Sequence, residues 1–542
     1  MSEAFNIIWL RNDLRLHDNP AFELANQAGL PVAVVFIVPH CWISAEHSDT
    51  TQPPPFSYRE PTLQAFNKQR LGNAKARFLR ASLIDLQRQL YRQNIQFQMV
   101  YGDPVTLFGQ WQTLGLQQVF TQQAQAPEEQ YWLDALAAAG IRLTQYNNQT
   151  LFSIEQLQAM KLNTTAEDWP ASFSGFRRRV EKAPECRPAA PTPPVALQLD
   201  EFELPRQPSI PWPTDFSGSA LASANTSATS TSATSTSATN TSGQSSALPA
   251  LRFQLAGGED NGLARLSAYL WQHQGLQHYK HSRNELCGDN VSSLFSAYLA
   301  WGCVSARRVW HDIECYEQQA GANEHSQWLK FELLWREYFH WCLRLHGRRY
   351  FRYQGLMSEP LTAADHGHAH NNTKHNNTKH NHSKDQHDSK HQHQTQKQQR
   401  WHAWQQARTG VPAIDAGLRE LINSGYCSNR MRQWLASYFI HELQLDWRLG
   451  AQFFETHLLD FDVAINWGNW AYLAGVGNDP QGQNGNGRWF SLNKQLQQYD
   501  PQVRHIQQWL PSLQSASLAD IQAHSRGDKL IADYPQPLVA VP

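Results

Sequence analysis

The chain has 542 residues, of which 46 are Lys or Arg and 47 are Asp or Glu, so its formal net charge is -1. This length is enough for two or three domains with sizeable cores. A nearly neutral chain gives no bulk argument for nucleic-acid binding, so such a function must depend on a local basic patch. The seven cysteines never stand in CxxC spacing, which argues against a zinc site and a disulfide framework and indicates reduced thiols.

The first segment, MSEAFNIIWLRNDLRLHDN, has no basic region before its short apolar run and passes directly into charged residues. It predicts a first β-strand rather than a signal peptide. The sequence contains no apolar run of about eighteen residues, the length that a membrane helix needs. We therefore expect a cytoplasmic protein with no membrane partner.

Residues 1–150 alternate between short apolar runs and amphipathic stretches. Five strands are predicted by apolar runs at residues 5–10, 31–38, 95–102, 116–121 and 141–146. Alternating strands and helices predict an α/β, Rossmann-like domain, in which helices cover both faces of a parallel sheet. The stretch RNDLRLHDN follows the first strand and should lie at the carboxyl edge of the sheet, where sites in such domains form.

The rest of the chain divides by composition. Residues 151–255 predict a connector with a low-complexity Ser/Thr/Ala insert that cannot bury enough surface to fold. Residues 256–510 carry apolar residues at helical spacing and predict an all-α domain. The His-rich insert at residues 364–400 lacks a fixed set of metal ligands, so we predict a disordered loop and assign no metal site. Residues 511–542 are expected to form an irregular tail.

Polar side chains interrupt an otherwise apolar stretch at residues 458–480. Asp460, Asp462 and Asn466 stand there among Leu, Phe, Val, Ile and Ala. A buried carboxylate is costly unless it is paired, and a buried amide needs hydrogen bonds. These residues therefore predict polar partners inside the helical domain.

Two further clusters begin or occupy apolar helices. Asn429, Arg430, Arg432 and Gln433 stand at a predicted helix start, where free N–H groups suit phosphate and an arginine suits a buried aspartate. An ordinary exposed first turn is the alternative. Glu332, Trp335 and Arg336 share one helix face by their spacing, and a surface ion pair is the alternative there.

Hydroxyl and basic clusters leave similar alternatives. An apolar helix is preceded by Ser292, Ser293 and Ser296. These serines could form a phosphate cradle or a plain helix cap. Basic residues gather at 177–179 and 344–352, as either part of a nucleic-acid groove or solvated helix ends.

Together these stretches resemble the photolyase/cryptochrome flavoprotein family, and within it the cryptochrome DASH group. The resemblance is carried, in family order, by WLRNDLRLHDNPAF (9–22), SSLFSAYLAWGC (292–303), ELLWREYF (332–339), TGVPAIDAGLRELINSGYCSNRMRQ (409–433) and DWRLGAQFFETHLLDFDVAINWGNWAYLAGVGND (446–479). It covers most of residues 1–510 apart from the two low-complexity inserts. It implies an N-terminal antenna domain and a C-terminal helical domain that binds FAD.

The resemblance also implies roles for individual residues. It implies that FAD is contacted by Tyr279, Ser292, Ser293, Leu294, Phe295, Ser296, Arg336, Asn429, Arg432, Asp460, Asp462 and Asn466. It implies that a flipped pyrimidine dimer is contacted by Glu332, Trp335, Asn429, Arg430, Gln433 and Tyr472.

The reaction implied for the family is photochemical electron transfer. Reduced FAD, excited directly or through an antenna pigment, passes an electron to a cyclobutane pyrimidine dimer; the ring splits and the electron returns. Glu332 would stabilise the dimer radical anion, and Asn466 matches a position near the reactive flavin nitrogen. The implied activity is that of a deoxyribodipyrimidine photo-lyase.

The DASH group implies repair mainly in single-stranded DNA. Gln433 and Tyr472 stand where many double-strand photolyases carry Met and Trp. Stacking of a base on an aromatic ring is worth roughly 1–3 kcal/mol, and flipping a base from a duplex costs a few kcal/mol. A site without the Trp platform therefore favours a strand that is already single.

Two family features are altered. Flavin photoreduction uses three tryptophans; Trp470 and Trp447 match the first two, but the third position falls on Gln394, leaving Trp401 or Trp404 as substitutes. The expected antenna pigment is 5,10-methenyltetrahydrofolate, although Ala126 lies near the place of the usual acidic residue.

The alternative function is a blue-light photoreceptor that binds FAD and signals through an unknown partner without repairing DNA. A helical scaffold without a cofactor would leave the buried polar residues unexplained. Because Glu332 and Asn466 are retained, we predict the repair enzyme, acting as a monomer.

Overall fold

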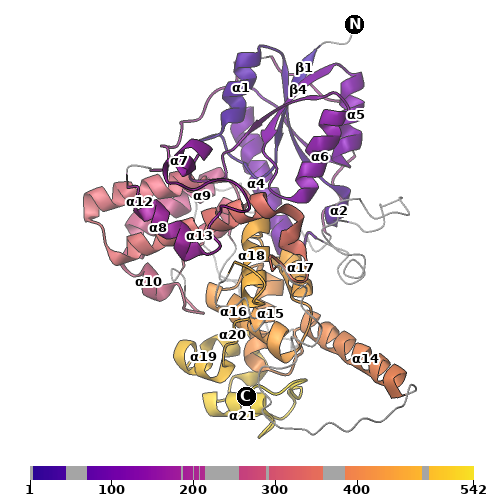
Figure 1. Ribbon diagram of the computed structural model, residues 1–542, viewed down its shortest axis with the longest axis vertical. Coiled ribbons are helices and arrows are strands. Elements are labelled where there is room, and N and C mark those ends of the chain that lie inside the picture. The colour runs from indigo at the N-terminus through magenta and orange to yellow at the C-terminus, as the bar shows by residue number, and fades with distance from the viewer. Residues whose placement is uncertain are drawn as a thin grey trace, which may run out of the picture.

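The computed structural model describes residues 4–43, 70–184, 187–198, 200–206, 208–213, 255–288, 292–357, 385–478 and 487–542. The Ser/Thr/Ala-rich insert and residues 364–384 of the His-rich insert lie outside these residues. An α/β domain forms one end of the molecule, and the helical region forms the rest (Figure 1). The predicted combination of an α/β domain and an all-α region is confirmed.

The α/β domain contains one parallel sheet, with strand order β3-β2-β1-β4-β5. Its strands are β1 (Phe5–Leu10), β2 (Val32–Val38), β3 (Phe97–Tyr101), β4 (Leu116–Gln122) and β5 (Arg142–Tyr146). Each begins within two residues of its predicted run, because short apolar segments that are buried on both faces read clearly in the sequence.

Helices cover both faces of the sheet, as Figure 1 shows. Alternate residues of a strand point to opposite faces. From β1, Ile8 and Leu10 join the apolar core that contains residues of α1 (Pro20–Ala28) and α4 (Asn73–Tyr91). Ile7 and Trp9 instead join the core formed with α5 (Pro104–Thr113) and α6 (Pro127–Ala138).

The remaining helices follow in chain order. After the short α2 (His40–Ile43), they are α7 (Ile154–Ala159), α8 (Phe173–Glu181), α9 (Glu259–Ser267), α10 (Tyr279–Ser282), α11 (Phe295–Ala300), α12 (Ala306–Ala320), α13 (Glu324–His346), α14 (Asp385–Gln405), α15 (Pro412–Ser424), α16 (Asn429–Ser437), α17 (Trp447–His457), α18 (Val463–Leu473), α19 (Leu492–Tyr499), α20 (Arg504–Trp509) and α21 (Leu518–Arg526). Helix α18 packs against both α13 and α17, so the stretch with Asp460 and Asp462 enters the centre of the helical region.

The stretch RNDLRLHDN joins the two parts of the molecule. Buried Arg15 donates to the carbonyl of Gly302 at 2.8 Å, and Arg307 pairs with Asp18 at 2.7 Å. Gly302 has φ 66°, and a Cβ there would lie 1.9 Å from the Asn12 carbonyl oxygen, so this close approach requires glycine. The carboxyl edge of the sheet therefore faces the helical region.

Three segments are more regular than we predicted. The connector contains α7 and α8, whose first turns are capped by Ser153 and Ser172. The expected irregular tail contains α21, with a capping box between Ser517 and Asp520. The described end of the His-rich insert belongs to α14, because Gln and Lys favour helices and α14 continues into buried Trp401.

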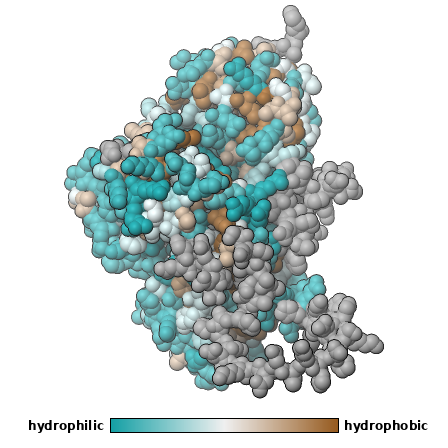
Figure 2. Space-filling view, in the orientation of Figure 1, coloured by the Kyte–Doolittle hydropathy of each residue, from teal (hydrophilic) through white to brown (hydrophobic). Residues whose placement is uncertain are grey.

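The part of the surface that is coloured in Figure 2 is largely hydrophilic. On the face shown in Figure 2, apolar residues emerge in small patches among hydrophilic ones. Among the described helices, none combines the length and the apolar character that crossing a bilayer would require.

Candidate functional site: a cavity in the helical region

A cavity of about 380 Å³ opens in the helical region between α10, α13, α16 and the segment that leads into α18. It brings together predicted residues from five separate sequence segments, namely Tyr279, Ser292, Ser293, Phe295, Ser296, Glu332, Trp335, Arg336, Asn429, Arg432, Gln433, Asp460, Asp462 and Tyr472. A smaller adjoining cavity of about 100 Å³ is lined by Asn466 and Trp470 and shares Asp460 and Asp462 with the first.

Three predicted residues do not line either cavity. Arg430 instead donates to Gln433 at 2.9 Å and to Asn284 at 3.2 Å. Trp447 is buried and donates to the Tyr353 carbonyl at 3.0 Å. Leu294 takes a left-handed conformation with φ 60° directly before α11, so its contribution is to turn the backbone.

Arg432 forms an ion pair with a buried aspartate, as the sequence suggested, and the partner is Asp460. The guanidinium Nη2 lies 2.8 Å and 3.1 Å from the two carboxylate oxygens, and Nε donates to the Cys427 carbonyl at 3.0 Å. The Asp460 side chain is only 2% exposed. Burial opposes the charge on Arg432, but the Asp460 carboxylate holds the pKa of the guanidinium above its ordinary value. The guanidinium of Arg432 therefore stays charged at the cavity wall.

Asp462 caps α18 and also faces the cavity. Its Oδ1 accepts from the backbone N–H groups of Ala464 and Ile465 at 3.0 and 3.1 Å. Its Oδ2 lies 2.7 Å from His340 Nε2 and 3.9 Å from Arg336. Burial alone would raise the pKa of Asp462, but His340, Arg336 and the helix N–H groups hold it well below its usual range. The carboxylate is therefore ionised.

Glu332 is held by a residue that the sequence analysis missed. Arg283 Nη1 donates to Glu332 Oε1 at 2.6 Å, and Trp328 Nε1 donates to the same oxygen at 3.1 Å. Burial raises the pKa of Glu332, and Arg283 partly offsets that effect. Arg283 stands 49 residues before Glu332, so no helical spacing signalled the pair.

Aromatic rings form the wall beside Glu332. Phe173 of α8 stacks on Trp335 with ring centroids 3.8 Å apart, and Tyr472 meets Trp335 edge-on at 6.1 Å. Arg488 lies 4.3 Å from the centre of the Tyr472 ring. This side of the cavity therefore offers flat apolar surfaces beside a carboxylate.

The segment that contains Ser292, Ser293 and Ser296 is held in place by Arg265, a residue that nothing in the sequence singled out. Arg265 donates to the carbonyls of Ser292 and Ser293 at 2.9 and 3.0 Å. These bonds hold both carbonyls, while the side chains of Ser292, Ser293 and Ser296 line the cavity. Hydroxyl donors and nearby arginines suit a diphosphate.

A separate cavity, of about 80 Å³, lies between the α/β domain and the helical region. We call it the interdomain cavity. Its walls are aromatic, from Trp9, Trp42, Trp132, Trp301 and Phe461. Its charged groups pair with one another, as Arg11 does with Glu129 at 3.1 Å and Arg70 with Glu128 at 2.8 Å and Glu455 at 2.7 Å. Ala126 lines this cavity without a carboxylate, two residues before Glu128 and three before Glu129.

Aromatic rings lead from the small cavity toward α14. The Trp470 ring lies on Gly450, where a Cβ would come within 2.2 Å of it. Trp470 contacts Phe439 at 5.6 Å between centroids, and Phe439 contacts Trp404 at 4.8 Å and Trp401 at 6.1 Å. Trp447 instead contacts Trp467 at 5.7 Å.

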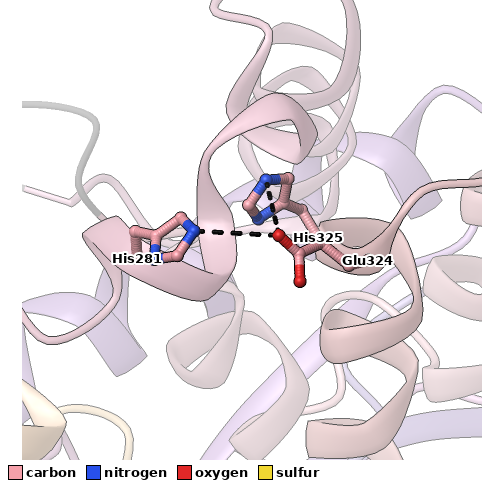
Figure 3. A group of neighbouring side chains, drawn as sticks. All are labelled: His281, Glu324 and His325. Atoms are coloured by element: carbon pink, nitrogen blue, oxygen red, sulfur yellow. Dashed lines mark ion pairs between the residues drawn. The ribbon is translucent and has the colours of Figure 1, made fainter.

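One cluster outside these cavities has metal-ligand chemistry. His281, Glu324 and His325 lie near one another on α10 and α13 (Figure 3), with His Nε2 to carboxylate distances of 3.8 and 3.9 Å. His325 Nδ1 accepts the backbone N–H of Lys280 at 3.2 Å, so Nε2 carries the ring proton. A ligating nitrogen needs its lone pair, and the other nitrogen usually donates. This geometry argues against a metal at the cluster.

Comparisons with known proteins agree with this architecture. The model of the FAD binding domain of DNA photolyase matches residues 328–542, and that of DNA photolyase matches residues 6–196. Cryptochrome DASH of Synechocystis sp. is 31% identical over 549 residues, covering 98% of this chain and 94% of that protein. Cryptochrome DASH of Gloeobacter violaceus is 29% identical over 556 residues, covering 99% and 94%.

Solved structures show the same fold. A Synechocystis sp. cryptochrome matches with a TM-score of 0.75 at 28% identity, covering 99% of this chain and 97% of that one. A bacterial class III photolyase from Agrobacterium tumefaciens matches with a TM-score of 0.66 at 22% identity, covering 99% and 95%.

The donor set of the helical-region cavity fits FAD. Its arginines and serine hydroxyls suit a diphosphate, and its aromatic walls suit flat rings. The buried side chains of Asp460 and Asp462 present oxygen acceptors for ring and ribose donors. Together with the full-length relatives and the matched domains, these features show that the chain belongs to the photolyase/cryptochrome family of FAD-binding flavoproteins, whose members named cryptochrome DASH resemble it over nearly its whole length.

Proposed function

We propose that this protein is a light-driven lyase of cyclobutane pyrimidine dimers that acts mainly on single-stranded DNA. We call the large cavity in the helical region the flavin cavity. The observation that carries the proposal is the position of Glu332 at its wall, held by Arg283 beside the aromatic rings of Trp335 and Tyr472. A pyrimidine dimer offers flat apolar surfaces and polar edges, and this wall offers both kinds of partner.

Each residue then has a distinct task. Trp335 and Tyr472 bind the apolar faces of the dimer, with Gln433 and Asn429 beside them. In its protonated form, which burial favours by raising its pKa, Glu332 exchanges its hydrogen bonds with Arg283 and Trp328 for one that it donates to the dimer, and thereby orients it and stabilises developing negative charge. Asn466, whose amide donates to the Ala451 carbonyl at 3.0 Å, presents its oxygen to the flavin. Reduced FAD supplies the photoexcited electron that the reaction returns at its end.

The preference for single strands rests on the aromatic platform. Tyr472 stands where many double-strand photolyases carry the larger indole of a Trp. The Arg488 guanidinium lies 4.3 Å from the centre of the Tyr472 ring and covers part of its surface. A dimer flipped from a duplex must recover an unstacking cost of a few kcal/mol from this platform. A single strand does not carry most of that cost.

We also propose that the interdomain cavity holds an antenna pigment, with 5,10-methenyltetrahydrofolate as the candidate. Support comes from the aromatic walls and from Glu128 and Glu129, which supply carboxylates close to Ala126. The cavity must widen from about 80 Å³ to admit a folate, which predicts weaker binding than that of FAD.

Photoreduction of the flavin is proposed to start at Trp470. Trp447 remains the proposed second residue of the relay. The rings of Trp404 and Trp401 pack on Phe439, which contacts Trp470, and this position supports them as substitutes for the tryptophan that Gln394 replaces.

The test irradiates the reduced, FAD-loaded protein with blue light in the presence of dimer-containing oligonucleotides and follows recovery of base absorbance. We expect faster repair of the single-stranded than of the double-stranded substrate. In Glu332→Gln, repair should fall by roughly one to two orders of magnitude while FAD binding is retained. No repair of either substrate by protein with bound, light-reducible FAD would refute the proposal and leave a photoreceptor.

A further inference from the structure

One wall separates the flavin cavity from the interdomain cavity. Arg336 and Asp462 line both. The Asp462 Oδ1 is used by the N–H groups of Ala464 and Ile465, so its second oxygen, Oδ2, is the one available to other partners. Whatever binds Oδ2 therefore controls how this carboxylate presents its charge to both cavities.

His340 is that partner. It lies in α13 and is 4% exposed. Its Nε2 is 2.7 Å from Asp462 Oδ2, and its Nδ1 is 2.9 Å from the amide nitrogen of Gln125. Gln125 belongs to the loop between β4 and α6 and lines the interdomain cavity. The imidazole thus connects the sheet of the α/β domain to the flavin cavity.

A single protonation state satisfies both hydrogen bonds. An amide nitrogen only donates, so Nδ1 accepts from Gln125. The proton of the neutral ring then sits on Nε2 and donates to the Asp462 carboxylate. Burial and the neighbouring Arg336 lower the pKa of His340, which agrees with a neutral ring at pH 7. The hydrogen bonds therefore run in one direction, from Gln125 to His340 and from His340 to Asp462, and the imidazole is the tautomer protonated at Nε2.

We infer that His340 is a positioning residue, which holds the ionised Asp462 carboxylate in place against the flavin and ties it to Gln125 of the α/β domain. The inference rests on FAD binding in the cavity and not on dimer repair. The Nε2–H dipole offsets part of the carboxylate charge that the flavin would otherwise experience. Because reduction adds negative charge to the flavin, loss of this donor should make reduction harder.

The experiment compares FAD-loaded variants by redox titration and visible absorption. His340→Leu removes both hydrogen bonds and should shift the flavin midpoint potential to a more negative value. His340→Gln can donate to Asp462 and accept from Gln125, so it should restore most of the wild-type potential. The matched control is His505→Leu, since buried His505 pairs with Glu420 at 2.9 Å and neither residue lines either cavity. Its potential should equal that of wild type.

A second variant keeps the test decisive if His340→Leu does not fold. Gln125→Leu removes only the distal hydrogen bond and should give a smaller shift in the same direction. A wild-type potential in His340→Leu, or a shift that His340→Gln fails to restore, would overturn the inference. If His340→Leu does not fold, a wild-type potential in Gln125→Leu would overturn it. A wild-type protein that binds no flavin would instead refute the proposed function.

Discussion

The two cavities treat their charged groups differently. In the interdomain cavity, one arginine, Arg70, pairs with two carboxylates, those of Glu128 and Glu455, and the remaining volume is about 80 Å³. In the flavin cavity Asp460 pairs with Arg432 and Glu332 pairs with Arg283, and the remaining volume is about 380 Å³. The interdomain cavity is therefore the smaller of the two, and the glutamates that line it are already paired with arginines that also line it.

This difference indicates which site is formed before its ligand arrives. Preorganised charged groups bind a ligand without a large ordering cost. The ion pairs among the residues that line the interdomain cavity must part or shift to admit a ligand. We therefore expect tight FAD binding and weaker antenna binding, and the following variants test the contrast.

The largest effect should come from Arg432→Leu. It removes the cation beside Asp460, whose side chain is 2% exposed, and leaves a buried carboxylate. Such a loss costs about 3–5 kcal/mol, and the FAD site should be lost with it. Urea unfolding and the flavin content of the purified protein measure both effects. Arg432→Lys keeps the charge and should retain more flavin; unchanged stability and flavin in Arg432→Leu would contradict the role of this pair.

Arg70→Leu tests the interdomain cavity in the same way. Glu455, with a side chain 1% exposed, loses its ion pair with Arg70, and Glu128 loses the same partner. We expect a loss of about 3 kcal/mol in unfolding free energy with FAD binding retained. Arg70→Lys is the control. Loss of flavin in a folded Arg70→Leu protein would show that the two cavities are not separable.

Tyr472 tests the dimer side of the flavin cavity. Tyr472→Ala should weaken binding of a dimer-containing single strand by about 1–3 kcal/mol, because a stacking surface is lost. Tyr472→Trp should improve binding of the duplex substrate. Fluorescence anisotropy in the dark measures both affinities. Equal affinities in all three proteins would exclude this ring from DNA binding.

The smallest effect concerns acid sensitivity near the interdomain cavity. Burial and neighbouring Lys75, which lines that cavity, lower the pKa of His457 from 6.5 to about 4. In the unfolded chain His457 takes up its proton near pH 6.5, so stability is present above that pH and falls as pH drops toward 4. Because His457 is only partly buried, we expect a loss of up to about 2 kcal/mol. His457→Asn should flatten this part of the pH–stability curve; an equally steep curve would assign the acid sensitivity elsewhere.

The sheet and the long helices were predictable because their signals are local. Apolar runs located the strands. The polar side chains of Asp460, Asp462 and Asn466 within the apolar stretch 458–480 indicated that they have buried polar partners, before any partner was identified. The sequence predicted that a helix-start arginine could pair with a buried aspartate, and the structure identifies the two residues as Arg432 and Asp460. The helix in the tail had a local signal as well, the capping box from Ser517 to Asp520, which the analysis overlooked.

The residues that were missed act over long sequence separations. Arg283 meets Glu332 across 49 residues, and His340 meets Asp462 across 122 residues. Spacing rules for helices and strands extend over only one or two turns, so they carry no information on such contacts. Only the packing of α10, α13 and α18 determines which of several buried polar residues become partners.

The most direct test of the central claim is the absorption spectrum of the purified wild-type protein after incubation with FAD. The open, preformed cavity predicts one bound flavin per chain, retained through gel filtration, and its loss in Arg432→Leu. A folded wild-type protein that remains colourless after this treatment would contradict the assignment of the helical-region cavity to FAD.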